Sequence, residues 1–161
     1  MITMLKLKNI KYILTVGLII ILTLVFFRSN LSSNNSQIVA VFNGAVFIKS
    51  PPATAKARLE WWRENQTILK EKYKVVPQSG FFRVPVMDFG EGFVELPNAN
   101  FLTGESEDDY ICNQEIKTAK RCIKKNTLFA ISGDSKNKIF IDVGGEVYIQ
   151  TPDGKTSLRK E

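Results

Sequence analysis

The sequence predicts an α+β fold: an N-terminal transmembrane helix followed by a small domain with a mainly antiparallel sheet and one long covering helix. Residues 12–27 contain no charge and are mostly Ile, Leu, Val and Phe. From residue 37 onward, short β-branched and aromatic runs alternate with glycine-containing turns, and residues 54–74 have the periodicity of an amphipathic helix. Several short strands with a single helix are typical of a sheet that the helix covers on one face.

The apolar segment indicates a membrane anchor. Residues 10–27 are near the short end of the roughly 17–25 residues that span a bilayer, and Lys11 can reach the headgroups. No A-x-A-like cleavage site follows the segment, and a cleaved signal peptide is the alternative. Lysines precede the segment and only Arg28 follows it, so the positive-inside rule places the N-terminus in the cytoplasm. The lipid bilayer is therefore an expected partner, through residues 10–27.

This segment divides the chain into three parts. A cytoplasmic tip and transmembrane anchor occupy residues 1–28, a polar spacer residues 29–36, and an α+β domain outside the cytoplasm residues 37–161. Four of the 22 basic residues flank the anchor, so residues 29–161 hold 18 basic against 16 acidic residues, a net charge of only +2. A nucleic-acid-binding domain concentrates basic charge in itself, so we expect no nucleic acid as partner.

The two cysteines agree with an exported domain. Cys112 and Cys122 are ten positions apart, and an isolated pair in an oxidising compartment predicts a disulfide. Two free thiols are one alternative. A metal site is another, but the chain has no histidine, so carboxylates would have to complete a tetrahedral zinc site.

The first folded element is predicted to be a β-hairpin. In QIVAVFNGAVFIK, residues 37–49, Asn43-Gly44 separates two strand-like runs, and this dipeptide favours a type I′ turn. A pair of prolines ends the second run. A helix is then expected over residues 54–74, with Thr54 as its N-cap and Pro77 beyond its end.

Further strands are predicted after the helix. They are residues 81–89, 93–96, 126–132, 138–143 and 146–150. Pro85 cannot donate a backbone hydrogen bond, which indicates an edge position or a bulge in the first of them. Together with the hairpin they give six or seven short strands.

The helix carries two adjacent tryptophans, which point about 100° apart. Trp62 falls on the main core ridge with Leu59, Leu69 and Tyr73, whereas Trp61 and Ile68 form a second stripe on the flank. One interpretation is that a loop or the curved end of the sheet covers this flank. The other is that Trp61 and Ile68 are partner-binding residues, since exposed Trp is favoured at interface hot spots.

Several stretches resemble a known family. LEWWRENQTILKEKY (59–73), MDFGEGFVE (87–95) and RCIKKNTLFAI (121–131), after a short apolar segment and IVAVF, are similar to the enterobacterial membrane protein family Domain of Unknown Function 943. The resemblance implies a single-pass inner-membrane protein with a small periplasmic domain and no assigned activity. The chain departs from the family at Phe42, where a polar residue or histidine is expected, and in a longer acidic loop at 98–110.

Motifs for catalysis or metal binding are weak. DFG at 88–90 resembles the kinase magnesium motif, but the other kinase motifs are missing, so a turn is the simpler explanation. An acidic cluster lacks the spacing of an EF-hand loop and is expected to be solvated; it comprises Glu105, Glu107, Asp108 and Asp109. Asp88 and Glu91 could support glycoside hydrolysis only if a cleft held them across a substrate.

We therefore expect no enzyme, no cofactor and no metal site. The leading hypothesis is a periplasmic protein-binding module that acts as an immunity protein and neutralises a toxin delivered to the periplasm. An accessory or regulatory subunit of an envelope membrane complex is the first alternative. A periplasmic carboxylate-based hydrolase is the second.

Overall fold

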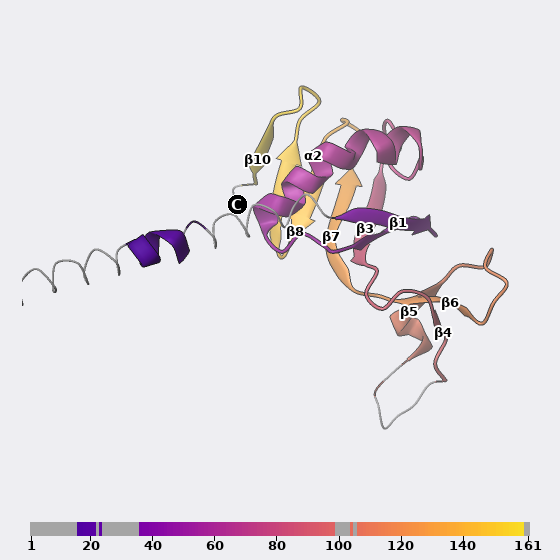
Figure 1. Cartoon of the computed structure of the whole chain (residues 1–161). Coiled ribbons are helices and arrows are strands. Elements are labelled where there is room, and N and C mark those ends of the chain that lie inside the picture. The colour runs from indigo at the N-terminus through magenta and orange to yellow at the C-terminus, as the bar shows by residue number, and fades with distance from the viewer. Residues whose placement is uncertain (1–15, 22, 24–35, 99–103, 105, 160–161) are drawn as a thin grey trace, which may run out of the picture.

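The folded domain consists of two β-sheets and one long helix (Figure 1). The computed structural model describes residues 16–21, 23, 36–98, 104 and 106–159. The larger sheet has the strand order β1-β2-β3-β7-β8-β9-β10. These strands are Gln37–Phe42, Ala45–Lys49, Phe82–Asp88, Thr127–Gly133, Ile139–Val143, Glu146–Gln150 and Thr156–Leu158.

The smaller sheet and the helix complete the domain. The smaller sheet has the order β4-β6-β5, and its strands are Val94–Glu95, Lys120–Lys124 and Tyr110–Cys112. Helix α2 spans Ala55–Glu71, and a short 3-10 helix, Glu107–Asp109, precedes β5.

The large sheet is mixed rather than purely antiparallel. β2 and β3 pair in parallel, with Val46 opposite Val86 and Ile48 opposite Asp88. Parallel neighbours need a crossover connection, and α2 provides it because it lies between β2 and β3 in the sequence. The remaining strand pairs of both sheets are antiparallel. This arrangement leaves β1 and β10 as the two end strands of the large sheet.

The sequence signals at the first turn and at the helix start are confirmed. Asn43 and Gly44 both have positive φ, 50° and 73°, as a type I′ turn requires. The Thr54 side chain accepts a hydrogen bond from the N–H of Ala57 (3.2 Å) and caps the helix. Arg58 fixes the first turns of α2 to β7, since its Nη1 donates to the Leu128 carbonyl at 2.8 Å.

The helix ends at Glu71, three residues earlier than predicted. Lys74 adopts a left-handed conformation with φ of 51°, which reverses the chain direction. The N–H groups of Val75 and Val76 then donate back to the Leu69 carbonyl, at 3.1 and 3.4 Å. This reversal buries Val76. The chain therefore packs Val76 into the core instead of continuing the helix by a further turn.

The main hydrophobic core fills the space between α2 and one face of the large sheet. Alternate residues of each strand point to the same face, and those that face α2 are the apolar ones. The buried members are Val46, Ile48, Trp61, Trp62, Leu69, Val76, Val84, Val86, Phe129, Ile131, Ile141 and Val143.

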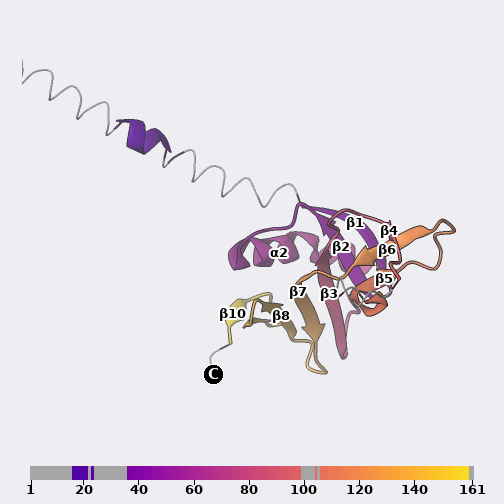
Figure 2. The ribbon, with the colours of Figure 1, turned by 90° about the horizontal axis from the view of Figure 1, so that it is seen from below.

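A second, smaller core lies on the opposite face of the sheet. Ile123 of the small sheet packs there with Ala45, Phe47 and Met87, and the rings of Phe42 and Phe47 stack at 4.7 Å between centroids. Figure 2 shows α2 and the small sheet on different sides of strands β1 to β3. The first three strands are therefore covered on both faces.

The predicted fold class is wrong. The described part of the folded domain is mostly β-sheet with one covering helix, whereas the sequence predicts an α+β domain behind an N-terminal transmembrane helix. Within the described residues, no helix combines the length and the apolar character needed to cross a membrane. Of the predicted span 10–27, only residues 16–21 and 23 are described, and they are helical; the rest lies outside the described residues.

The strands differ from the predictions mainly in pairing. Pro85 lies in β3, which has neighbours on both sides, but the pairing with β2 begins only at Val86. Pro85 therefore occupies a local edge, next to an irregularity between Val86 and Met87. β4 does not pair with β3, the strand before it; it pairs with β6 in the small sheet. Strands β5, β6 and β10 were not predicted, because β5 has only three residues and β6 and β10 are short and mostly polar.

Candidate functional site

A groove runs between α2 and the hairpin formed by β9 and β10. One part, of about 350 Å³, is lined by α2 and by strands β8 to β10. A second part, of about 420 Å³, continues past the C-terminal end of α2 to the turns after β7 and β9. Gln66, Gln150 and Gly154 line both parts, so the two form one continuous groove. We name it the helix–hairpin groove.

Its floor is fixed by hydrogen bonds between α2 and β9. The indole Nε1 of Trp62 donates to the side-chain oxygen of Gln150 at 2.7 Å. The amide nitrogen of Gln150 in turn donates to the side-chain oxygen of Gln66 at 3.5 Å. The hydrogen bond of the buried Trp62 ring thus fixes the distance between α2 and β9. The side-chain amides of Gln66 and Gln150 lie at the floor, where they can contact a bound chain.

The α2 wall of the groove carries a row of cations. Lys56, Arg63 and Lys70 are seven residues apart, which places them on one face of the helix, and all three line the groove. Within the described part of the chain, none of the three has a carboxylate within ion-pair distance. Glu60 also lines this wall and is the only acid on it. The α2 wall is therefore a net positive surface.

The acids of the opposite wall are engaged in turns. The Asp134 carboxylate accepts from the N–H groups of Lys136 and Lys138, both at 2.9 Å. Asp153 accepts from the hydroxyl of Thr151 and lies 3.2 Å from the ammonium of Lys155. The Thr151 hydrogen bond and then the Lys155 contact lower the pKa of Asp153 below its ordinary value. These carboxylates organise the turns, and within the described residues neither lies within ion-pair distance of a cation on α2.

The predicted partner-binding residues do not meet in this groove. Trp61 is 1% exposed, and its ring packs edge-on against Phe129 at 5.7 Å between centroids. The structure thus does not place Trp61 where a partner could contact it directly, because Trp61 is buried in the main core beside Phe129 of β7. Ile68 is 36% exposed on the flank of α2, outside the groove lining, and its role in binding stays a prediction.

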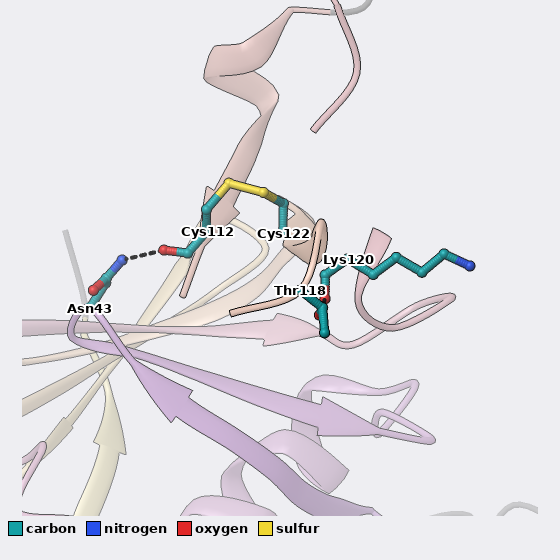
Figure 3. The surroundings of a disulfide bond; sticks show 5 residues. All are labelled: Asn43, Cys112, Thr118, Lys120 and Cys122. Carbon is teal, nitrogen blue, oxygen red and sulfur yellow. Dashed lines mark hydrogen bonds between the residues drawn. A yellow bond between two sulfur atoms is a disulfide. The ribbon is translucent and has the colours of Figure 1, made fainter. Parts of the chain in front are cut away.

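The predicted disulfide is present. Cys112 and Cys122 are directly opposite each other on β5 and β6, with an S–S distance of 2.01 Å (Figure 3). The side-chain amide of Asn43 donates to the Cys112 carbonyl at 3.1 Å, which ties the first hairpin turn to the small sheet. The disulfide closes the β5–β6 hairpin next to the second core.

Two of the acidic candidates, Asp88 and Asp109, have structural roles. Asp88 and Glu91 both line a cavity of about 490 Å³, and the Asp88 carboxylate accepts the N–H of Gly90 at 3.0 Å. Asp109 completes a capping box with Ser106, and Glu105 lies outside the described residues. No group of three or more potential metal ligands occurs in the described part of the chain.

Sequence reasoning missed the groove residues. Lys56, Arg63 and Lys70 fall in the polar arc of the helix, where charge is ordinary and gives no sign of a binding surface. Their seven-residue spacing was the available signal. Gln150 and the turn at Thr151 lacked any such signal, because only the strand order brings them opposite α2.

Comparison with known families gives one match. The model of the family described as Enterobacterial putative membrane protein (DUF943) matches residues 6–160. No curated protein and no solved structure matches the chain.

Proposed function

The chain belongs to this family of enterobacterial membrane proteins, and we propose that its folded domain is a periplasmic protein-binding module. The helix–hairpin groove carries the proposal. It is open to solvent, its floor is fixed by the Trp62–Gln150 hydrogen bond, and the cations on its α2 wall have no ion-pair partners in the described residues. Unpaired charge beside a preformed groove favours a partner of opposite charge.

The disulfide supports a periplasmic location of the folded domain. Disulfides persist in the bacterial periplasm and are rare in the cytosol, where thiols are kept reduced. Cys122 is 1% exposed and lies beside Ile123 of the second core, so the disulfide is built into the fold. A domain stabilised by a buried disulfide is adapted to the periplasmic side of the inner membrane, where the disulfide persists.

Within this class we favour an immunity protein that neutralises a toxin delivered to the periplasm. Such a protein needs only to occupy its target, and a rigid domain with a charged groove can do so without catalysing a reaction. The alternative is an accessory or regulatory subunit of an envelope membrane complex. Deleting the gene separates the two: loss of protection in mixed culture with toxin-producing siblings supports the immunity role, and a defect of the envelope without such competitors supports the subunit.

Site-specific photocrosslinking in the native enterobacterium tests the binding function. A photocrosslinking amino acid replaces Gln66 or Leu158 in the groove, and Lys117 on the disulfide hairpin serves as control position. We expect a discrete adduct with one protein from both groove positions and none from Lys117. Absence of a groove adduct under conditions where the phenotype of the deletion is visible would contradict the proposal.

A further inference from the structure

The hairpin wall of the groove ends in a strand whose outer edge pairs with no other strand of the described residues. β10 pairs with β9 through Thr156, Ser157 and Leu158, and it is the last strand of the sheet. All of its residues are exposed. Its outer edge therefore offers backbone groups to another extended chain.

The hydrogen bonds to β9 show which groups point outward. The Lys155 carbonyl accepts from Thr151 at 2.9 Å, and the N–H of Arg159 donates to Val147 at 2.8 Å. Residues that bond to a neighbouring strand alternate with residues that do not in an antiparallel pair. The N–H and C=O groups of Thr156 and Leu158 consequently point away from β9, at the outer edge.

The same two residues turn their side chains toward the groove. Thr156 and Leu158 both line it, opposite Lys56 and Arg63 of α2. A strand added beside β10 would continue this alternation, so every second side chain would face the α2 cations. Arg159, immediately after β10, adds positive charge at one end of the edge, whereas Lys155 before β10 lies 3.2 Å from the Asp153 carboxylate.

We propose that β10 accepts an extended, acidic segment of the partner protein as an additional strand. The acidic side chains of that segment face the cations Lys56 and Arg63, and its backbone bonds to Thr156 and Leu158. This inference rests on the proposed protein-binding function and adds the chemistry of the bound segment. Backbone hydrogen bonds supply affinity in such strand addition, and the side-chain positions supply specificity.

Two other arrangements fit less well. Antiparallel pairing of two copies of β10 about Ser157 would set Lys155 directly opposite Arg159, and like charges at opposite positions destabilise a sheet. β1 forms the other end of the sheet, but its pairing with β2 is irregular between Ile38 and Ala40, and such irregularities protect edges from further strands.

Synthetic peptides test the inference on the full chain in detergent. The main probe is an alternating Thr-Glu peptide of about ten residues, long enough to extend along the edge. A Thr-Lys peptide tests the charge. The Thr-Glu peptide with N-methyl groups on the alternate amides that face β10 tests the backbone bonds. We expect only the unmodified Thr-Glu peptide to bind, and we expect it to slow amide hydrogen exchange in residues 155–159.

Charge reversal on α2 tests the groove side. Lys56→Glu with Arg63→Glu should weaken binding of the Thr-Glu peptide by about tenfold or more, because two attractive charges become repulsive. The matched control, Lys117→Glu with Lys120→Glu, makes the same charge change on the disulfide hairpin and should leave binding unchanged. The melting temperatures of both double variants verify that the domain remains folded.

The remaining outcomes overturn the inference. No binding of the Thr-Glu peptide, equal binding of its N-methylated form, or binding without protection of 155–159 excludes strand addition at β10. Concentration-dependent protection of 155–159 without peptide identifies a second copy as the occupant. If groove photocrosslinks to a partner persist in these cases, the proposed function stands and only the inference fails; if the crosslinks are absent too, the function itself is wrong.

Discussion

The indole N–H of Trp62 and the side-chain oxygen of Gln150 are 2.7 Å apart, and this hydrogen bond joins α2 to β9 beneath the helix–hairpin groove. Trp62 is 2% exposed, and its hydrogen bond to Gln150 is partly buried. A buried donor left without a partner costs about 1–3 kcal/mol. The bond therefore contributes to stability and also fixes the groove width.

Gln150→Ala should lower the free energy of unfolding by about 1–3 kcal/mol, because the Trp62 N–H loses its acceptor. Gln66→Ala is the matched control: its contact with Gln150 is 3.5 Å long, so we expect a change below about 0.5 kcal/mol. Urea unfolding monitored by tryptophan fluorescence measures both. Equal losses in the two variants would contradict the assignment of the Trp62 bond.

Trp61→Ala should lower the free energy of unfolding by about 3–5 kcal/mol, because a fully buried ring leaves a cavity against Phe129. Ile68→Ala, on the partly exposed flank of the same helix, should cost less than about 1 kcal/mol. Thermal unfolding of both variants distinguishes the positions. A Trp61→Ala domain as stable as the wild type would show that the ring is not part of the core.

The local elements could be predicted from the sequence because short-range signals specify them. Asn43-Gly44 gave the first turn and Thr54 the helix N-cap, since each depends on a few neighbouring backbone groups. The last helical turns could not be predicted in this way. The burial of Val76, a tertiary contact, favours the early chain reversal at Lys74.

The sheet arrangement needed information that short-range patterns lack. Strand β2, helix α2 and strand β3 follow one another as a crossover unit, and this order could have indicated the parallel pair. The residues Thr156–Leu158 carry almost no strand signal, and they form β10 because they pair with the edge of β9. The groove depends on that strand, so the candidate site was not visible in the sequence.

The disulfide should stabilise the domain by about 2–3 kcal/mol, since it closes a small loop in the unfolded chain. Thiol labelling of protein extracted without reductant should find neither Cys112 nor Cys122 free. The double variant Cys112→Ala with Cys122→Ala should melt at a lower temperature and exchange amide protons faster in β5 and β6. Quantitative labelling of both thiols in native protein would refute the disulfide.

Acid should loosen the β9–β10 turn through Asp153. The Thr151 hydrogen bond lowers the pKa of Asp153 in the folded state, so the carboxylate stabilises the turn at any pH above its ordinary value of 3.8. This stabilisation is lost as the pH falls from there through the folded-state pKa. Amide exchange of residues 151–156, corrected for its intrinsic pH dependence, should rise over this range. Asp153→Asn should remove that rise, and an unchanged rise in the variant would assign it to another group.

Gly133→Ala should destabilise the large sheet by about 1–3 kcal/mol, because overpacking forces side chains and backbone to shift. Gly133 lies opposite Phe82 on the neighbouring strand, and a Cβ at this position would overlap the Phe82 ring. The test is a double-mutant cycle with Phe82→Ala, read by chemical denaturation. Removing the ring also removes the overlap, so Gly133→Ala should cost much less in the Phe82→Ala background, a coupling of about 0.5–3 kcal/mol. Equal costs in both backgrounds would mean that the glycine is required for a reason other than the ring that covers it.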